Sequence, residues 1–157
     1  DELGLRTPTV DKPWSSEEFM AALDAAKASG KYEFALDLGM NDQAEWYSYA
    51  FSPFLQSFGG DIVDRSTYRT AEGALNGEAA QAFGKWWQSL FTGGYAPGTS
   101  EDPALVRPVT PGYVVQAKVF TKALADIANG ADVADTLDAA VDEIDADIES
   151  NGGYGHR

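Results

Sequence analysis

The segment from Asn41 to Gly60, NDQAEWYSYAFSPFLQSFGG, joins small polar residues to a dense group of aromatic rings. A helix that buries one side keeps its apolar residues on a single stripe, whereas the rings here cover more than one face. We therefore expect some of these rings in the core and the others on a face of the helix that does not pack in the core. The six aromatic residues are Trp46, Tyr47, Tyr49, Phe51, Phe54 and Phe58.

Hydrogen-bonding groups lie directly beside the first two of these rings. Asn41, Asp42, Gln43 and Glu45 come just before Trp46 and Tyr47. A ligand that is flat and apolar on one side and rich in hydroxyl groups at its edge needs this mixture. Sugars have that character, so the segment predicts one wall of a sugar site.

The length and composition predict one folded domain. A chain of 157 residues with 44% hydrophobic residues can bury a real core and is not disordered as a whole. No apolar run approaches the roughly 18 to 20 residues of a membrane span. The first residues, DELGLRTPTVDKPW, contain no basic region followed by an apolar one, so the sequence predicts no signal peptide.

The charge and the missing cysteines exclude several kinds of function. The net charge is −14, with 25 acidic against 11 basic residues, which argues against nucleic acid and anionic membranes as partners. Solubility is the simpler interpretation of this charge. Without cysteine the chain has no disulfide, thiol nucleophile or thiolate metal site.

The first half of the chain predicts two helices around a strand. A capping box from Ser15 to Glu18 begins a helix that Gly30 ends. Residues 32–38 (YEFALDL) alternate at first and predict a strand. A helix over about 44–58 follows, with a kink or break at Pro53. Residues 59–65 predict a turn and a short strand, which could form half of a hairpin with residues 68–70.

The second half predicts three helices. The first covers about 78–91, and a connector rich in glycine and proline follows over 92–111. The second runs from Val114 or Val115 to Ala128, and Asp132 caps the third. The third carries a clean apolar stripe, spaced by four, four, three and four residues: Val133, Leu137, Val141, Ile144 and Ile148.

The sequence gives weak support for metal binding or catalysis. The acidic face of the last predicted helix, which includes Asp145 and Asp147, is interpreted as solvated, since a calcium loop would require glycine where Ser150 stands. The only histidine is His156, near the end of the chain, which argues against a Ser-His-acid arrangement. No phosphate-binding glycine loop occurs. Asp37, Asp42 and Glu45 could serve glycoside hydrolysis, but carboxylates beside aromatic rings equally serve sugar binding.

The segment VRPVTPGY, residues 106–113, allows two interpretations. Its two prolines hold an extended path that leads to Tyr113 at the start of a helix. It is either a rigid linker with a packed tyrosine, or it places Arg107 near a hinge and Tyr113 at a cleft.

Four segments carry a resemblance to a known family. TPTVDKPWSSEEFMAALDAAKASGK resembles the passage at which extracellular solute-binding proteins of the maltose-binding type enter their C-terminal lobe. FALDLGMNDQAEWYSYAFSPFLQSFGGDIVD is similar to the strand, ligand loop, aromatic helix and hairpin that follow there. LNGEAAQAFGKWWQSLFTGGYAP is similar to the next helix, and RPVTPGYVVQAKVFTKALADIANGADVADTLDAAVDEIDADI resembles the C-terminal helices of the carbohydrate-binding branch. Their order and spacing carry the resemblance, which covers nearly the whole chain.

One departure from that family shapes the expected domain. In the family, the chain returns to the N-terminal lobe before the RPxTPxY segment, whereas here residues 100–104 run directly into Leu105. We therefore interpret residues 1–157 as a single domain, the C-terminal lobe alone, built from 1–104 and 105–157. The resemblance implies an α/β fold: a helix-rich lobe of the type II periplasmic-binding-protein fold, with a small sheet flanked by helices.

The resemblance also implies a function and a site. The parent protein would capture a sugar or oligosaccharide outside the cytoplasm for an ABC permease, without chemistry, cofactor, metal or membrane insertion. The isolated lobe would bind weakly. Trp46 would stack on a pyranose ring with Tyr47 beside it, and the remaining ligand-binding residues would be Asn41, Glu45 and Tyr113. The alternatives are a stand-alone or engineered scaffold without ligand and a carbohydrate-active enzyme.

Overall fold

The computed structural model describes residues 3–40, 46–97 and 111–153, apart from the side chains of Pro111 and Tyr113. These residues form five helices and no strand. The α/β prediction, with its small sheet flanked by helices, is therefore wrong, and the described fold is all-α. The helices are α1 (Ser16–Ala28), α2 (Trp46–Ser57), α3 (Glu78–Thr92), α4 (Pro111–Ala128) and α5 (Val133–Ser150).

The two segments expected as strands make isolated backbone hydrogen bonds instead of ladders. In the segment 32–38, Leu36 N donates to Tyr95 O at 2.9 Å. In the segment 59–74, Asp61 N donates to Ala74 O and Asp64 N to Thr70 O, so the chain doubles back like a hairpin without strand geometry. A strand is stabilised by a ladder of backbone hydrogen bonds to its neighbours, and within the described residues neither segment forms such a ladder.

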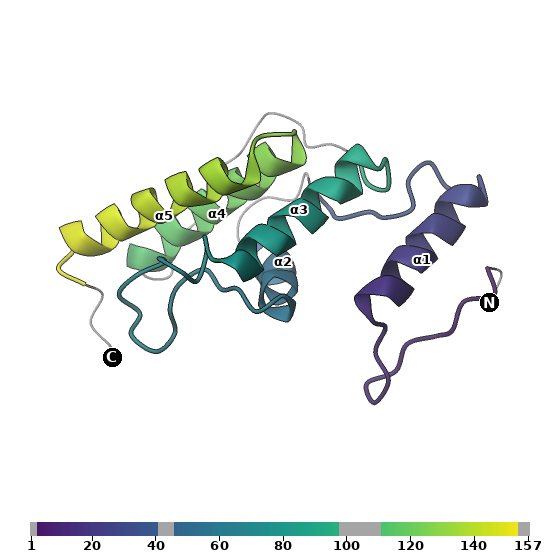
Figure 1. Cartoon of the computed structure of the whole chain (residues 1–157), viewed down its shortest axis with the longest axis horizontal. Helices are drawn as coiled ribbons and strands as arrows, with labels where there is room; N and C mark the ends of the chain where they lie inside the picture. The colour runs from purple at the N-terminus through teal and green to yellow at the C-terminus, as the bar shows by residue number, and fades with distance from the viewer. Residues whose placement is uncertain (1–2, 41–45, 98–110, 154–157) are drawn as a thin grey trace.

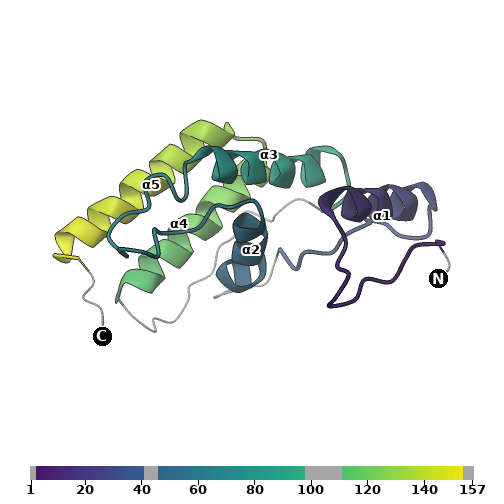
Figure 2. The ribbon, with the colours of Figure 1, turned by 60° about the horizontal axis from the view of Figure 1, so that its bottom comes forward.

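Four helices pack together and one stands apart (Figures 1 and 2). α4 and α5 form an antiparallel pair, α3 packs on both, and α2 packs on α3 and α4. In both views α1 lies at the end of the molecule opposite the C-terminal end of α5. The junction expected between Ala104 and Leu105 lies outside the described residues.

The core is rich in aromatic rings and is closed by the predicted stripe of α5. All five stripe residues from Val133 to Ile148 are buried, which confirms that prediction. Trp87 is fully buried at the centre, where its indole N–H donates to Leu124 O at 3.1 Å and its ring lies 4.7 Å from that of Phe51. The buried indole thus has a partner for its polar atom and leaves no unsatisfied donor there.

The predicted helix signals are largely confirmed. Ser15 and Glu18 form the capping box, and the Asp132 side chain accepts from Asp135 N. α2 runs through Pro53 without a break. α4 begins at Pro111, a few residues earlier than predicted.

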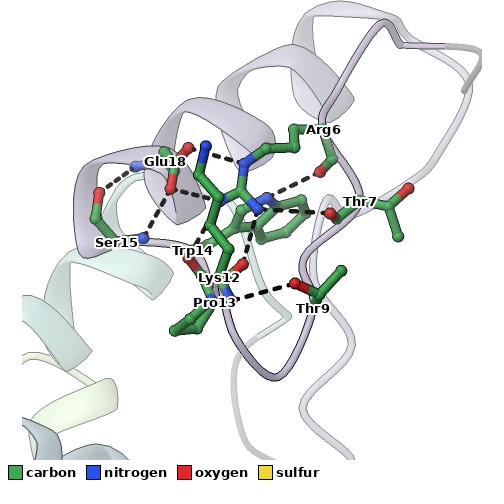
Figure 3. Close-up of polar contacts among 8 residues, drawn as sticks. All are labelled: Arg6, Thr7, Thr9, Lys12, Pro13, Trp14, Ser15 and Glu18. Atoms are coloured by element: carbon green, nitrogen blue, oxygen red, sulfur yellow. Dashed lines mark hydrogen bonds and ion pairs between the residues drawn. The ribbon is translucent and has the colours of Figure 1, made fainter.

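Arg6 organises the loop that leads into α1 (Figure 3). Its guanidinium donates to Glu18 Oε2 and to Lys12 O, each at 2.8 Å, and Trp14 Nε1 donates back to Arg6 O at 2.9 Å. Glu18 therefore accepts from Arg6 and caps the helix at the same time. These contacts hold residues 6–15 as an ordered entry to the helix.

Side chains attach α1 to the rest of the molecule. The Phe19 ring lies 6.5 Å from that of Phe54 and 6.2 Å from that of Trp86. At the other end of the helix, Tyr95 donates its hydroxyl to Asp24 Oδ1 at 2.6 Å, and Lys27 donates to Gly93 O. Leu23 of α1 is also buried in the hydrophobic core, so α1 is attached by aromatic rings, polar contacts and an apolar side chain.

Candidate functional site

The two sides of α2 have different roles. Tyr47, Phe51 and Leu55, spaced by four residues, are buried and face the core. On the opposite side, Trp46 is half-buried and Tyr49 is exposed, and this side continues with two further exposed residues, Pro53 and Gln56. This division confirms that the aromatic residues of the segment serve more than one face.

Trp46 is held in place and is half-buried. Its indole N–H donates to Leu38 O at 2.9 Å, and its ring meets the edge of Phe51 at 6.3 Å. The bond to Leu38 ties α2 to the segment that precedes it. The polar atom of the indole is therefore already engaged within the chain.

Tyr47 lies beside Trp46 in sequence but is almost fully buried. It is 5% exposed, its hydroxyl donates to Met40 O at 2.9 Å, and its ring meets that of Phe51 at 5.1 Å. Burial raises the pKa of Tyr47 above its ordinary value. In this position Tyr47 fixes the backbone at Met40, directly before the expected ligand loop.

The structure tests the rest of the predicted site only in part. Asn41 and Glu45 lie outside the described residues, and so does Asp42. Tyr113 belongs to the first turn of α4, and its side chain is not described. Among the predicted ligand-binding residues, Trp46 and Tyr47 are thus the two whose placement can be stated, and both contact the segment 38–40.

The prediction missed Tyr49, which is the most exposed aromatic residue of the described chain. It is 77% exposed, and its ring centroid lies 6.4 Å from that of Trp46 with the planes inclined by 39°. Helical spacing could have found it. Positions 46, 49 and 53 share one side of a helix, and 47, 51 and 55 share the other.

Acidic groups elsewhere are used mainly for structure. Asp37 Oδ1 accepts from Gly39 N at 2.9 Å and so closes the turn before the expected loop. On α5, Asp145 accepts from Thr70 and from the backbone of Ala71, and Asp138 accepts from Asn76. These two carboxylates are therefore not simply solvated, which corrects the interpretation of that face. No group of three potential metal ligands is found within the described ranges.

A groove of about 270 Å³ lies between α4 and α5. Its lining mixes alanines with the ion pair between Lys122 and Asp126 and two further acids, Asp135 and Glu143. None of its lining residues belongs to α2. The groove and the outward side of α2 are therefore separate surfaces.

Comparison with known proteins gives no relative for this chain: no family model, no curated protein and no solved structure matches it. None of the described helices has the length and apolarity needed to cross a bilayer.

Proposed function

We propose that this chain binds carbohydrate on the outward side of α2, without chemistry. The observation that carries the proposal is Trp46: its indole N–H is held by Leu38 O, and its half-buried ring lies beside the exposed ring of Tyr49. Aromatic faces of this kind stack on the apolar face of a pyranose. The residues just before the helix, Asn41 to Glu45, would take the hydroxyl groups.

The resemblance to solute-binding proteins supports a role in sugar uptake. In that role the chain would correspond to the C-terminal lobe of a protein that works outside the cytoplasm and docks on an ABC permease. The order and spacing of the four resembling segments support the proposal. The described residues form no strand, whereas the resemblance implies a small sheet.

A single wall predicts weak binding. The outward side of α2 carries the exposed residues Tyr49, Pro53 and Gln56, so a sugar lying on it would be covered on one face. Stacking between two aromatic rings adds about 0.5 to 1.5 kcal/mol beyond area burial, and we expect a similar gain for a ring on a sugar. We therefore expect dissociation constants in the millimolar range or weaker, which corresponds to a binding free energy near −4 kcal/mol.

NMR titration with a panel of sugars tests the proposal. The side-chain N–H signal of Trp46 should shift with at least one sugar, and the Trp46→Ala variant should lose the shifts of neighbouring backbone signals. Tyr32→Ala, which removes another exposed aromatic ring outside α2, is the matched control and should bind like the parent chain. Binding that survives in Trp46→Ala would exclude this site.

Two other outcomes would favour the alternatives. Release of product from a chromogenic glycoside, lost in Glu45→Gln, would indicate an enzyme. No response to any sugar would indicate a scaffold, and submicromolar binding would contradict the single wall.

A further inference from the structure

The groove between α4 and α5 is formed by one face of each helix. The two helices lie side by side in both views (Figures 1 and 2). On α5 the groove is lined at positions 135, 136, 139, 140 and 143, which share a single helical side. Its volume of about 270 Å³ is close to the lower end of the range of roughly 300 to 1,000 Å³ for small-molecule sites. The groove therefore suits a small ligand.

The floor of this groove is apolar. Val119, Ala123 and Ala140 are buried, and Ala139 is exposed beside them. Because alanine has no atoms beyond Cβ, three of these four positions leave room for an alkyl chain.

The rim of the groove carries an excess of negative charge. Three carboxylates and one ammonium group line it, which gives a net charge of −2. Lys122 pairs with Asp126 at 2.5 Å, whereas Asp135 and Glu143 take part in no ion pair within the described ranges. These two exposed carboxylates are eight residues apart on α5, about 12 Å along the helix axis. The uncompensated charge is thus divided between two separate places on the rim.

Lys122 shows that the rim accommodates an alkylammonium group. Its side chain is a chain of four methylene groups that ends in an ammonium, and it lines the groove. Its hydrogen bond to Asp126 is the main cause that raises the pKa of Lys122 above the ordinary 10.5, and the charge of Glu143 adds to the shift. Carboxylates from both helices therefore favour the charged form of an amine here.

We propose that the groove binds a linear aliphatic diamine or polyamine, with its methylene chain on the alanine floor and ammonium groups beside Asp135 and Glu143. An ammonium group only donates hydrogen bonds and a carboxylate only accepts them, so the two are complementary. A metal ion would use the carboxylates but not the apolar floor between them. This site is separate from the outward side of α2 and does not depend on sugar binding there.

The distance between the two carboxylates predicts a dependence on ligand length. NMR titrations at low ionic strength compare diaminopropane with diaminooctane, which carry the same two charges. Diaminooctane should bind more tightly by about two- to fivefold, the gain from one exposed ion pair, and should shift the backbone signals of Ala139 and Ala140. Octylamine, which keeps the alkyl chain but has one ammonium group, should also bind more weakly than diaminooctane. Equal affinities for the two diamines would indicate a diffuse counterion effect and overturn the site.

Variants separate the groove from the general acidity of α5. Glu143→Gln and Asp135→Asn should each lower the affinity for diaminooctane by about two- to fivefold. Asp142→Asn removes an equal charge from an exposed position of the same helix outside the groove, and it should bind like the parent chain. An equal loss in Asp142→Asn would overturn the proposal.

Ala139→Leu tests the apolar floor without changing any charge. Because Ala139 is exposed, the larger side chain should leave the stability in urea close to that of the parent chain while it fills the groove and abolishes binding. Lys122→Met frees Asp126 and should increase the affinity. Unchanged binding in Ala139→Leu, or a basic peptide that binds where no diamine does, would overturn the inference.

Discussion

Thr70 and Asp145, 75 positions apart in the chain, are joined by a hydrogen bond of 2.7 Å from Thr70 Oγ1 to Asp145 Oδ2. The second carboxylate oxygen accepts from Ala71 N, also at 2.7 Å. One side chain of α5 thereby holds the turn that leads from α2 to α3. A second contact, from Asn76 Nδ2 to Asp138 Oδ1 at 3.0 Å, fastens the same segment two turns earlier on α5.

Asp145→Ala should lower the free energy of unfolding by about 1.5 to 3 kcal/mol, the range for hydrogen bonds to a charged group. The loss leaves Ala71 N without its carboxylate acceptor. Urea denaturation at neutral pH measures the effect. Asp142→Ala is the matched control, since it removes the same charge from an exposed position of the same helix and should stay within about 0.5 kcal/mol of the parent chain. Equal effects of both substitutions would show that charge, not the contact, is responsible.

Gly84 marks the close crossing of α3 and α5. A Cβ atom added there would lie 2.5 Å from Val133 Cγ1. Gly84→Ala gains about 1 kcal/mol of helix propensity, but the β-branched Val133 at the start of α5 cannot move aside easily. We expect a net destabilisation of about 1 to 3 kcal/mol, measured by urea denaturation.

A double-mutant cycle tests the cause of that effect. Val133→Ala removes the methyl group that meets the added Cβ, so Gly84→Ala should cost less in the Val133→Ala background than in the parent chain. The same cost in both backgrounds would assign the loss to another contact. A parent chain less stable than Gly84→Ala would contradict the close crossing itself.

The features predicted correctly are those that a few neighbouring residues determine. The stripe of α5, the capping box at Ser15 and the cap at Asp132 depend on spacing and side-chain chemistry within one or two turns. The strand over 32–38 was wrong because a strand needs partners. Its composition was compatible with a strand, but among the described residues its backbone pairing with another segment is the single bond from Leu36 N to Tyr95 O.

Long-range polar contacts were equally hidden in the sequence. In the sequence, Asp145 looks like the other acidic residues on the same face of α5. It accepts hydrogen bonds from Thr70 and Ala71 because the segment 61–76 passes beside it in the fold. The candidate site was predicted in part. Local aromatic density pointed to Trp46, but the exposure of Tyr49 depends on which side of α2 the core covers.

Acid should weaken the entry to α1 through Glu18. The hydrogen bond from Arg6 is the main cause that lowers the pKa of Glu18 below its ordinary 4.5, and the backbone N–H of Ser15 adds to it. A lowered pKa in the folded chain contributes stability that is complete above pH 4.5 and is lost as the pH falls through the folded value. Glu18→Gln removes this contribution.

The unfolding midpoints of the parent chain and Glu18→Gln should therefore differ by a constant amount near neutral pH and converge in acid. Glu149→Gln, an equal loss of charge far from Arg6, is the control. A difference between parent and Glu18→Gln that stays constant into the acid range would contradict the role of the Arg6 contact.

Alkali should act on Tyr47. Burial raises its pKa above the ordinary 10.0, so below pH 10.0 the phenol is neutral in both states and its contribution to stability is complete. As the pH rises further, the unfolded chain releases the proton first, and the folded state loses stability.

The stability cost of Tyr47→Phe should depend on pH. At neutral pH it should cost about 0.5 to 1.5 kcal/mol, because the hydrogen bond to Met40 O is lost. Above pH 10.0 the cost should shrink, since the variant has no phenol to ionise at this position and other tyrosines titrate equally in both chains. Urea denaturation at both pH values measures the difference, with Tyr49→Phe, an exposed hydroxyl on the same helix, as the control. A cost that grows in alkali would mean that the Tyr47 hydroxyl ionises more readily in the folded chain than its burial allows.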